Sequence, residues 1–229
     1  MRIGDLQVEV VKKNIKNIHL AVYPPNGKVR IAVPESVNDE TIRLYTISKL
    51  AWIRRQQRRF KGQNRQTERQ YIDRETHYYL GRKYLLKVVE DARSAKVEVN
   101  GKRQIILHVK PEATREYKQN HMNEWYRAEL KALMPDIIAK WEKILDLQVA
   151  EWGVKHMKTK WGTCNPTAQR IWFNLELAKK PIKCIEYIVV HEMMHFHERT
   201  HNEHYQAYLD RYLPDWKKLR EALNELPVT

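Results

Sequence analysis

The segment "YIVVHEMMHFHERTHNEHY", residues 187–205, holds five of the ten histidines of this 229-residue chain. Within it, His191, Glu192 and His195 form the pattern H-E-x-x-H. Residues four apart lie above one another on one face of an α-helix, so both imidazoles can bind one metal ion. The apolar run "CIEYIVV" just before His191 predicts that this helix is buried. Buried imidazoles need partners, so the pattern favours a metal centre over a pair of hydrogen-bonded core histidines.

The chemistry of the motif points to zinc and to hydrolysis. Imidazole nitrogens bind Zn²⁺ at about 2.0–2.1 Å. Glu192 is one position after His191, about 100° around the helix, so it reaches a water on the metal rather than the metal itself. A carboxylate at that position acts as a general base, and the zinc lowers the pKa of the water towards about 7. The motif therefore predicts a zinc-dependent hydrolase with Glu192 as its catalytic base.

A catalytic zinc site also needs a third protein ligand. The segment offers four further donors, which are His197, Glu198, His201 and His204. His197 faces about 200° away from His195 around the helix, and His204 is expected at the surface. These two histidines are therefore predicted to be bystanders.

The choice between Glu198 and His201 depends on where the helix ends. Glu198 returns to the ligand face of an unbroken helix, because it follows His191 by seven residues. His201 becomes a ligand only if the helix ends near residues 198–200 and the chain turns back. The residues Thr-His-Asn that follow are poor in a helix interior, and Asn202 is a suitable N-cap for the next helix. From the residues alone, both ligand sets stay open.

Residues 158–216 resemble the YgjP-like metallopeptidase domain family, which is related to the SprT and WLM zinc peptidases. One matching element is the strand motif Trp-Gly-Thr-Cys, Trp161–Cys164, and another is a following strand that ends in Asn-Leu. Further matches are the Val-Val-His-Glu-x-x-His helix and an aromatic residue, Tyr205, shortly after His201. The resemblance covers the C-terminal half strongly and the N-terminal half in overall layout only.

Carried over position by position, the resemblance implies that His191, His195 and His201 bind zinc and that Glu192 is the base. It also implies a zincin-like domain and a protein or peptide substrate, because the SprT and WLM relatives act on proteins at DNA. The ligand spacing equals that of the metzincin pattern. However, Glu198 stands at that pattern's glycine, and no metzincin-type Met-turn follows.

The Trp161–Cys164 strand and two tyrosines are further candidates for the site. Gly162 permits a close backbone approach, and the strand is interpreted as an edge to which an extended peptide substrate adds. Cys164 is expected to be a small packed residue. Tyr205 and Tyr208 are candidates to stabilise an oxyanion, but packing beside the helix is the favoured interpretation.

The net charge of +14 comes from the part of the chain before Pro181. From Pro181 onward, the chain has six Lys/Arg and eight Asp/Glu, whereas the stretch "RRQQRRFKGQNRQTER", residues 54–69, is densely basic. Such a stretch is typical of nucleic-acid or nucleotide binding, and equally of a solvated helix face. Two alternative functions follow: a metal-dependent nucleoside triphosphate phosphohydrolase, or a nucleic-acid-associated protein with a structural zinc.

Each alternative lacks one expected feature. No Gly-rich phosphate loop is present, and H-E-x-x-H suits amide hydrolysis better than phosphoanhydride hydrolysis. A structural zinc site is usually closed by four ligands, so it would need Glu198 or Cys164 in addition to three histidines. The metallopeptidase is therefore the leading hypothesis.

The hydrophobic pattern predicts an α+β fold with a β-rich N-terminal region, residues 1–113, and a zincin-like metallohydrolase domain, residues 114–229. Strands are expected over 6–11, 18–23, 29–34, 76–91, 96–111, 152–164 and 169–177. Helices are expected from Asn38 or Asp39 to about 60, over 114–146 with an interruption or bend near Pro135, from Pro181 through the motif, and near 203–212 and 215–225. Residues 62–70 are expected to form a loop.

A cytoplasmic protein without a membrane partner is expected. No run of about 18 apolar residues is present, and the first residues lack the apolar stretch of a signal peptide. The two cysteines, Cys164 and Cys184, make neither a disulfide framework nor a C-x-x-C zinc knuckle.

Overall fold

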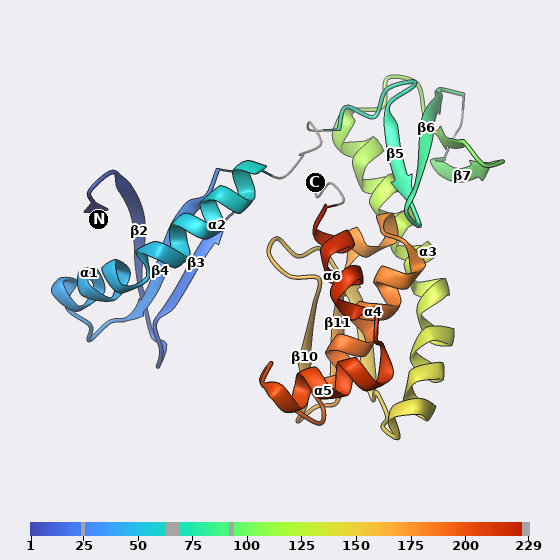
Figure 1. Ribbon diagram of the computed structural model, residues 1–229. Helices are drawn as coiled ribbons and strands as arrows, with labels where there is room; N and C mark the ends of the chain where they lie inside the picture. The colour runs from blue at the N-terminus through green and yellow to red at the C-terminus, as the bar shows by residue number, and fades with distance from the viewer. Residues whose placement is uncertain (24–25, 63–68, 92–93, 226–229) are drawn as a thin grey trace. The chain divides into compact units, whose positions relative to one another are not determined.

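The computed structural model describes residues 1–23, 26–62, 69–91 and 94–225 (Figure 1). The chain divides into two compact units, Met1–Asn64 and Arg65–Thr229, and each has a hydrophobic core of its own. This division comes earlier than the boundary expected after residue 113, because the strands between residues 76 and 108 share the core of the second unit. Helices and sheets occur in both units, so the expected α+β class is confirmed.

The first unit is a four-stranded sheet with helices on one face (Figure 1). Its sheet order is β1-β2-β4-β3, and β2 and β4 run parallel. The three longer strands agree with the predicted ones. The elements are β1 (Arg2–Ile3), β2 (Leu6–Lys13), β3 (His19–Tyr23), β4 (Lys28–Pro34), α1 (Asp39–Ser48) and α2 (Leu50–Gly62).

The single helix expected up to residue 60 is two helices that meet at Lys49. The buried Thr46 hydroxyl donates to the Ile42 carbonyl at 2.7 Å, and the Lys49 N–H donates to the Thr46 carbonyl at 3.1 Å. This tight turn ends α1. Ile42 on α1 and Ile53 on α2 are both buried in the core of the unit.

The basic stretch expected at residues 54–69 is described only in part, since residues 63–68 lie outside the described residues. The loop expected over 62–70 falls mostly on the same residues. On α2, Arg54 and Arg58 are exposed, and Arg54 pairs with Asp5. At least the described beginning of the stretch is therefore a solvated helix face.

The second unit begins with a sheet of order β5-β6-β8-β7, which shares a core with a long helix. The strands expected over 76–91 and 96–111 form two antiparallel hairpins, β5–β6 and β7–β8, and the turn after Asn100 uses Gly101 at φ +60°. The helix runs unbroken through Pro135, so the interruption considered there does not occur. The elements are β5 (Thr76–Tyr79), β6 (Arg82–Val89), β7 (Lys96–Asn100), β8 (Gln104–His108) and α3 (Arg115–Leu145).

A three-stranded sheet follows, with the order β10-β11-β9 and β10 at an edge. It consists of β9 (Glu151–Lys155), β10 (Gly162–Asn165) and β11 (Arg170–Asn174). The single strand expected over 152–164 was wrong, because the loop 156–161 separates β9 from β10. The buried Asn174 amide stabilises this loop by donating to the carbonyls of Met157 and Lys160, at 2.9 and 2.7 Å. Its oxygen accepts from the Met157 N–H at 3.3 Å.

The remaining elements surround one buried helix, α4. They are the 3₁₀ helix η1 (Leu175–Lys179), α4 (Ile182–Met194), α5 (Glu203–Tyr212) and α6 (Trp216–Glu225), close to the predicted positions. Helices α3, α5 and α6 and the edge strand β10 all contact α4. Within the described ranges, none of the helices has both the length and the apolar character required to cross a bilayer.

Candidate metal centre

The motif lies at the C-terminal end of α4, where the helix stops and the chain turns back. Helix α4 ends at Met194, and the N–H groups of His197 and Glu198 both donate to the Met194 carbonyl, at 3.0 and 2.9 Å. Helix α5 then begins with Asn202 as its N-cap, whose side chain accepts from the Tyr205 N–H at 3.0 Å. The predicted helix break is confirmed, and it comes a few residues earlier than expected.

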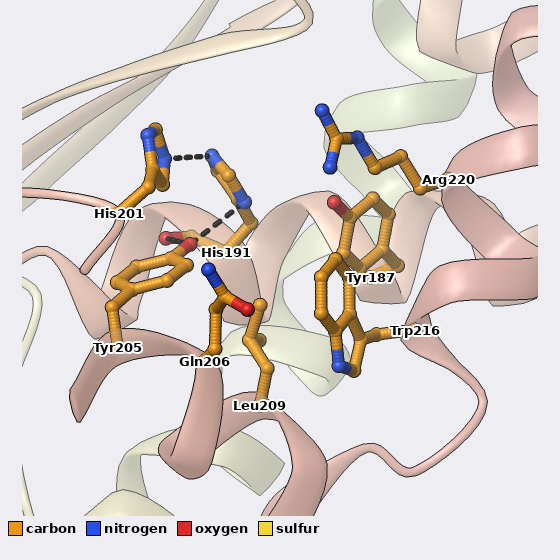
Figure 2. Close-up of a pocket in the computed structure, with 8 residues that line it drawn as sticks. All are labelled: Tyr187, His191, His201, Tyr205, Gln206, Leu209, Trp216 and Arg220. Carbon is orange, nitrogen blue, oxygen red and sulfur yellow. Dashed lines mark hydrogen bonds between the residues drawn. The ribbon is translucent and has the colours of Figure 1, made fainter. Parts of the chain in front are cut away.

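The break brings His191, His195 and His201 together. One nitrogen from each of the three imidazoles lies within 4.8 Å of the corresponding nitrogens of the other two. The ring centroids are 4.8–5.2 Å apart. The His191 and His201 Nε2 atoms are separated by 3.2 Å (Figure 2). Two nitrogens bound to one tetrahedral Zn²⁺ at about 2.05 Å stand about 3.3 Å apart, so this pair already has the spacing of ligands.

Hydrogen bonds made by the Nδ1 atoms of His195 and His191 leave the Nε2 atoms of these two rings available as ligand atoms. The His195 Nδ1 is 3.0 Å from the Glu198 carbonyl, which can only accept, so Nδ1 carries the proton. The Tyr205 hydroxyl donates to the His191 carbonyl at 3.0 Å and accepts from the His191 Nδ1 at 2.7 Å (Figure 2). Each Nε2 then presents a lone pair, as a metal-binding histidine requires.

The electrostatic environment keeps the His191 and His201 rings neutral. Burial, together with the neighbouring His195 and His201, lowers the pKa of His191 to about 3. Burial also lowers the pKa of His201. At neutral pH both rings are therefore unprotonated and able to bind a cation. The donor set fits a metal that prefers imidazole nitrogen.

Glu192 lies between α4 and the edge strand β10. Its side chain is buried, and burial raises the pKa of its carboxyl to about 7, while the charge of Lys160 lowers it. A Cβ atom added to Gly162 on β10 would lie 2.5 Å from the Glu192 Oε1 and 2.7 Å from its Cγ. Glycine at position 162 therefore provides the space that the Glu192 carboxylate occupies, which gives the close approach predicted for Gly162 its physical reason.

The alternative third ligand is turned away from the three histidines. The Glu198 Oε1 accepts from the N–H and the hydroxyl of Thr200, at 3.2 and 3.1 Å, so this carboxylate stabilises the turn between α4 and α5. His197 donates from Nε2 to the Leu145 carbonyl at 3.3 Å, and His204 is exposed on α5. Cys164 is half-buried on β10, and burial raises its pKa to about 12, so its thiol stays protonated.

The two tyrosines differ from one another in their surroundings. Tyr205 is buried with its hydroxyl bound to His191, so it positions a candidate ligand. Tyr208 is partly exposed, and its ring packs 5.9 Å from that of His197. The expected buried packing therefore occurs for Tyr205 and not for Tyr208. The role of Tyr205 was missed, although its spacing of four residues after His201 was visible in the sequence.

A hollow of about 160 Å³ opens beside His191 and His201, and sequence reasoning did not find it. Its walls include Tyr187, one turn before His191 on α4, and Trp216 and Arg220 on α6 (Figure 2). The spacing of four residues between Tyr187 and His191 could have indicated that both side chains lie on the same face of the helix. Arg220 lies 29 positions after His191, and only the packing of α6 on α4 brings the two together.

Comparison with known proteins gives a family for the chain. No curated protein matches the sequence. The sequence profile described as "YgjP-like, metallopeptidase domain" matches residues 16–226, which include most of the first unit as well as the three clustered histidines. The match extends well beyond the C-terminal half on which the sequence resemblance depended. The chain belongs to the YgjP-like metallopeptidase domain family.

Proposed function

We propose that this protein is a zinc-dependent metallopeptidase with a zincin-like active site. The observation that carries the proposal is the convergence of His191, His195 and His201, with the buried Glu192 carboxylate next to His191 on the same helix. Family membership supports a metallohydrolase and hence a metal ion. The choice of zinc is supported by three imidazole donors that lie close together.

In this proposal each residue has one role. Zinc held by the three histidines would act as a Lewis acid toward a water molecule and the scissile carbonyl. Glu192 takes the proton from the attacking water, and its pKa of about 7 suits proton transfer near neutral pH. Tyr205 holds the His191 ring in the tautomer that leaves Nε2 free. The protonated Glu192 then returns the proton to the leaving amine.

The edge strand β10 provides a position for the substrate. In the described part of the chain it pairs with β11 on one side only, so its other edge can accept an extended peptide by strand addition. The Glu192 carboxylate lies against Gly162 on this strand. A peptide bound along β10 would therefore pass close to the base.

Nucleoside triphosphate hydrolysis is a second candidate, and positive charge at the site favours it. The charges of Lys160 and Arg220 act on Glu192 and on His191, and such cations hold phosphates as well as carboxylates. The hollow beside the histidines measures about 160 Å³, below the roughly 300–1,000 Å³ of pockets that enclose drug-sized ligands. A peptide that places one side chain in the hollow is therefore the better fit.

A structural zinc is supported less well. Within the described ranges the cluster consists of three histidines, and neither Glu198 nor Cys164 belongs to it. Three protein ligands leave one coordination position open, which is the arrangement of catalytic sites. Nucleic-acid binding through residues 54–69 is a separate prediction, and none of the observations above tests it.

The test compares the wild-type protein with Glu192→Gln for zinc content and for hydrolysis of casein-derived peptides and of nucleoside triphosphates. We expect peptide hydrolysis in the wild type, and its loss in Glu192→Gln with zinc retained. Hydrolysis of triphosphates alone would replace the proposal with the second candidate. Equal peptide hydrolysis by both proteins would remove Glu192 from the mechanism.

A matched pair of variants tests the third ligand. His201→Ala should lose zinc, whereas Glu198→Ala should keep it, because the Glu198 carboxylate binds Thr200 and not the metal. Zinc loss in Glu198→Ala with retention in His201→Ala would reverse the assignment.

A further inference from the structure

The hollow beside the histidine cluster has one wall on α4 and another on α6. Tyr187 and His191 lie on the same face of α4, four residues apart, and Trp216 and Arg220 are likewise four apart on α6 (Figure 2). The hollow therefore begins at a candidate metal ligand and extends toward the Arg220 guanidinium. All of these residues belong to the second compact unit.

One part of the hollow is lined by large side chains that are held in place. Tyr187, Leu209 and Trp216 are almost fully buried, and the Trp216 indole N–H donates to the Asp210 carboxylate at 2.7 Å. Rings fixed in this way pack against the methylene groups of a side chain with little loss of conformational entropy. This part of the hollow suits an aliphatic stem rather than a second charged group.

The polar end of the hollow is cationic. The Arg220 guanidinium lines this end of the hollow, together with Tyr187 and His191 (Figure 2). Arg220 already has contacts within the protein. A guanidinium has five N–H donors in a planar fork, so it can bind a carboxylate in addition to its existing contacts.

We propose that this hollow is a specificity subsite that binds a carboxylate of the peptide substrate, with Arg220 as the recognising cation and Tyr187 and Trp216 as the walls for the aliphatic stem. The carboxylate belongs to the residue beside the scissile bond, either as a glutamate side chain or as the chain terminus. The volume of about 160 Å³ accommodates one such group and not a whole small-molecule ligand. This inference rests on the proposed peptidase function and names its substrate class.

The first experiment compares pairs of peptides that differ only in the carboxylate. One pair has Glu or Gln beside the scissile bond and an amidated terminus, and the other has a free or an amidated terminus. We expect the acid to be preferred about 10- to 100-fold in kcat/KM for at least one pair, the usual effect of a charge-assisted hydrogen bond. The ratio within a pair does not depend on the fraction of folded protein.

The variants test Arg220 itself. Arg220→Gln should bring the acid-to-amide ratio close to one, and Arg220→Lys should retain part of the preference. Lys218→Gln is the matched control, because it removes the same charge from an exposed position on α6 and should leave the ratio unchanged. An unchanged ratio in Arg220→Gln, or the absence of any preference in the wild type, would overturn the inference.

A binding measurement separates this inference from the proposed function. Calorimetric titration of the Glu192→Gln protein with the same peptides measures affinity without turnover. If the wild type cleaves no peptide, yet the acid binds more tightly than the amide and Arg220→Gln abolishes the difference, the peptidase proposal fails and the subsite stands. If peptides are cleaved without an acid preference, the peptidase proposal stands and the subsite fails.

Discussion

Gly162→Ala should impair catalysis without removing the metal. The backbone at Gly162 is not in the left-handed region, so alanine brings no conformational strain of its own. The added Cβ would lie 2.5 Å from the Glu192 Oε1, whereas ordinary contact begins at 3.4 Å. The carboxylate must therefore shift by about 0.9 Å, the difference between these two distances.

A displacement of about 1 Å in a catalytic group can lower the rate about 100-fold, or about 2.7 kcal/mol in the activation barrier. We therefore expect kcat for a cleaved peptide to fall about 100-fold in Gly162→Ala. Zinc stoichiometry should stay at the wild-type value, because the three atoms nearest to the added Cβ all belong to Glu192 and not to a histidine. Thr163→Ala, the neighbouring position on β10, is the control and should retain most of its activity.

A double-mutant cycle tests the cause of the effect. Overpacking typically lowers the free energy of unfolding by about 1–3 kcal/mol, and here the atom that would be overpacked belongs to Glu192. In a Glu192→Ala background, Gly162→Ala should therefore have almost no effect on stability, as measured by urea denaturation. A wild-type kcat in Gly162→Ala, or equal destabilisation in both backgrounds, would refute the reasoning.

Two further predictions concern other buried groups. Tyr205→Phe removes both hydrogen bonds to His191, so zinc affinity in a chelator competition should fall about 10- to 100-fold while the thermal midpoint changes little; unchanged affinity would show that the hydroxyl does not position the ring. Burial lowers the pKa of His77 to about 4, from about 6.5, because the folded protein favours the neutral ring. The protein is therefore most stable above pH 6.5, and the free energy of unfolding decreases as the pH falls toward 4. Between pH 7 and pH 4.5 this loss amounts to about 2 kcal/mol in the free energy of unfolding. In urea denaturation, the free energy of unfolding of His77→Gln should therefore vary less with pH than that of the wild type. An equally strong dependence on pH would assign the loss to other groups.

Local signals in the sequence were sufficient to predict most helices and strands and the candidate metal-binding motif. Alternating residues marked the strands of both units, Asn202 marked the start of α5, and the poor helix formers before it marked a break in the chain. The spacing of His191, Glu192 and His195 was enough to predict a helix that presents two imidazoles on one face. These features depend on neighbours within a few residues, so the sequence contains them directly.

Other features depend on partners distant in the sequence, and the tertiary structure decided them. The sequence left Glu198 and His201 as alternatives, and the fold brings His201 to the cluster while Glu198 binds the turn. The loop between β9 and β10 was missed because Asn174, far along the chain, supplies its hydrogen bonds.

The sequence by itself determined the candidate chemistry of this protein, through an H-E-x-x-H helix, its candidate third ligands and its family resemblance. The tertiary structure decided which side chains from distant parts of the chain surround these residues. Gly162 makes space for Glu192 only because β10 packs on α4, and Arg220 lines the hollow only because α6 does. The physical reason is that helix periodicity acts within a few residues, whereas close packing joins side chains that no local pattern relates.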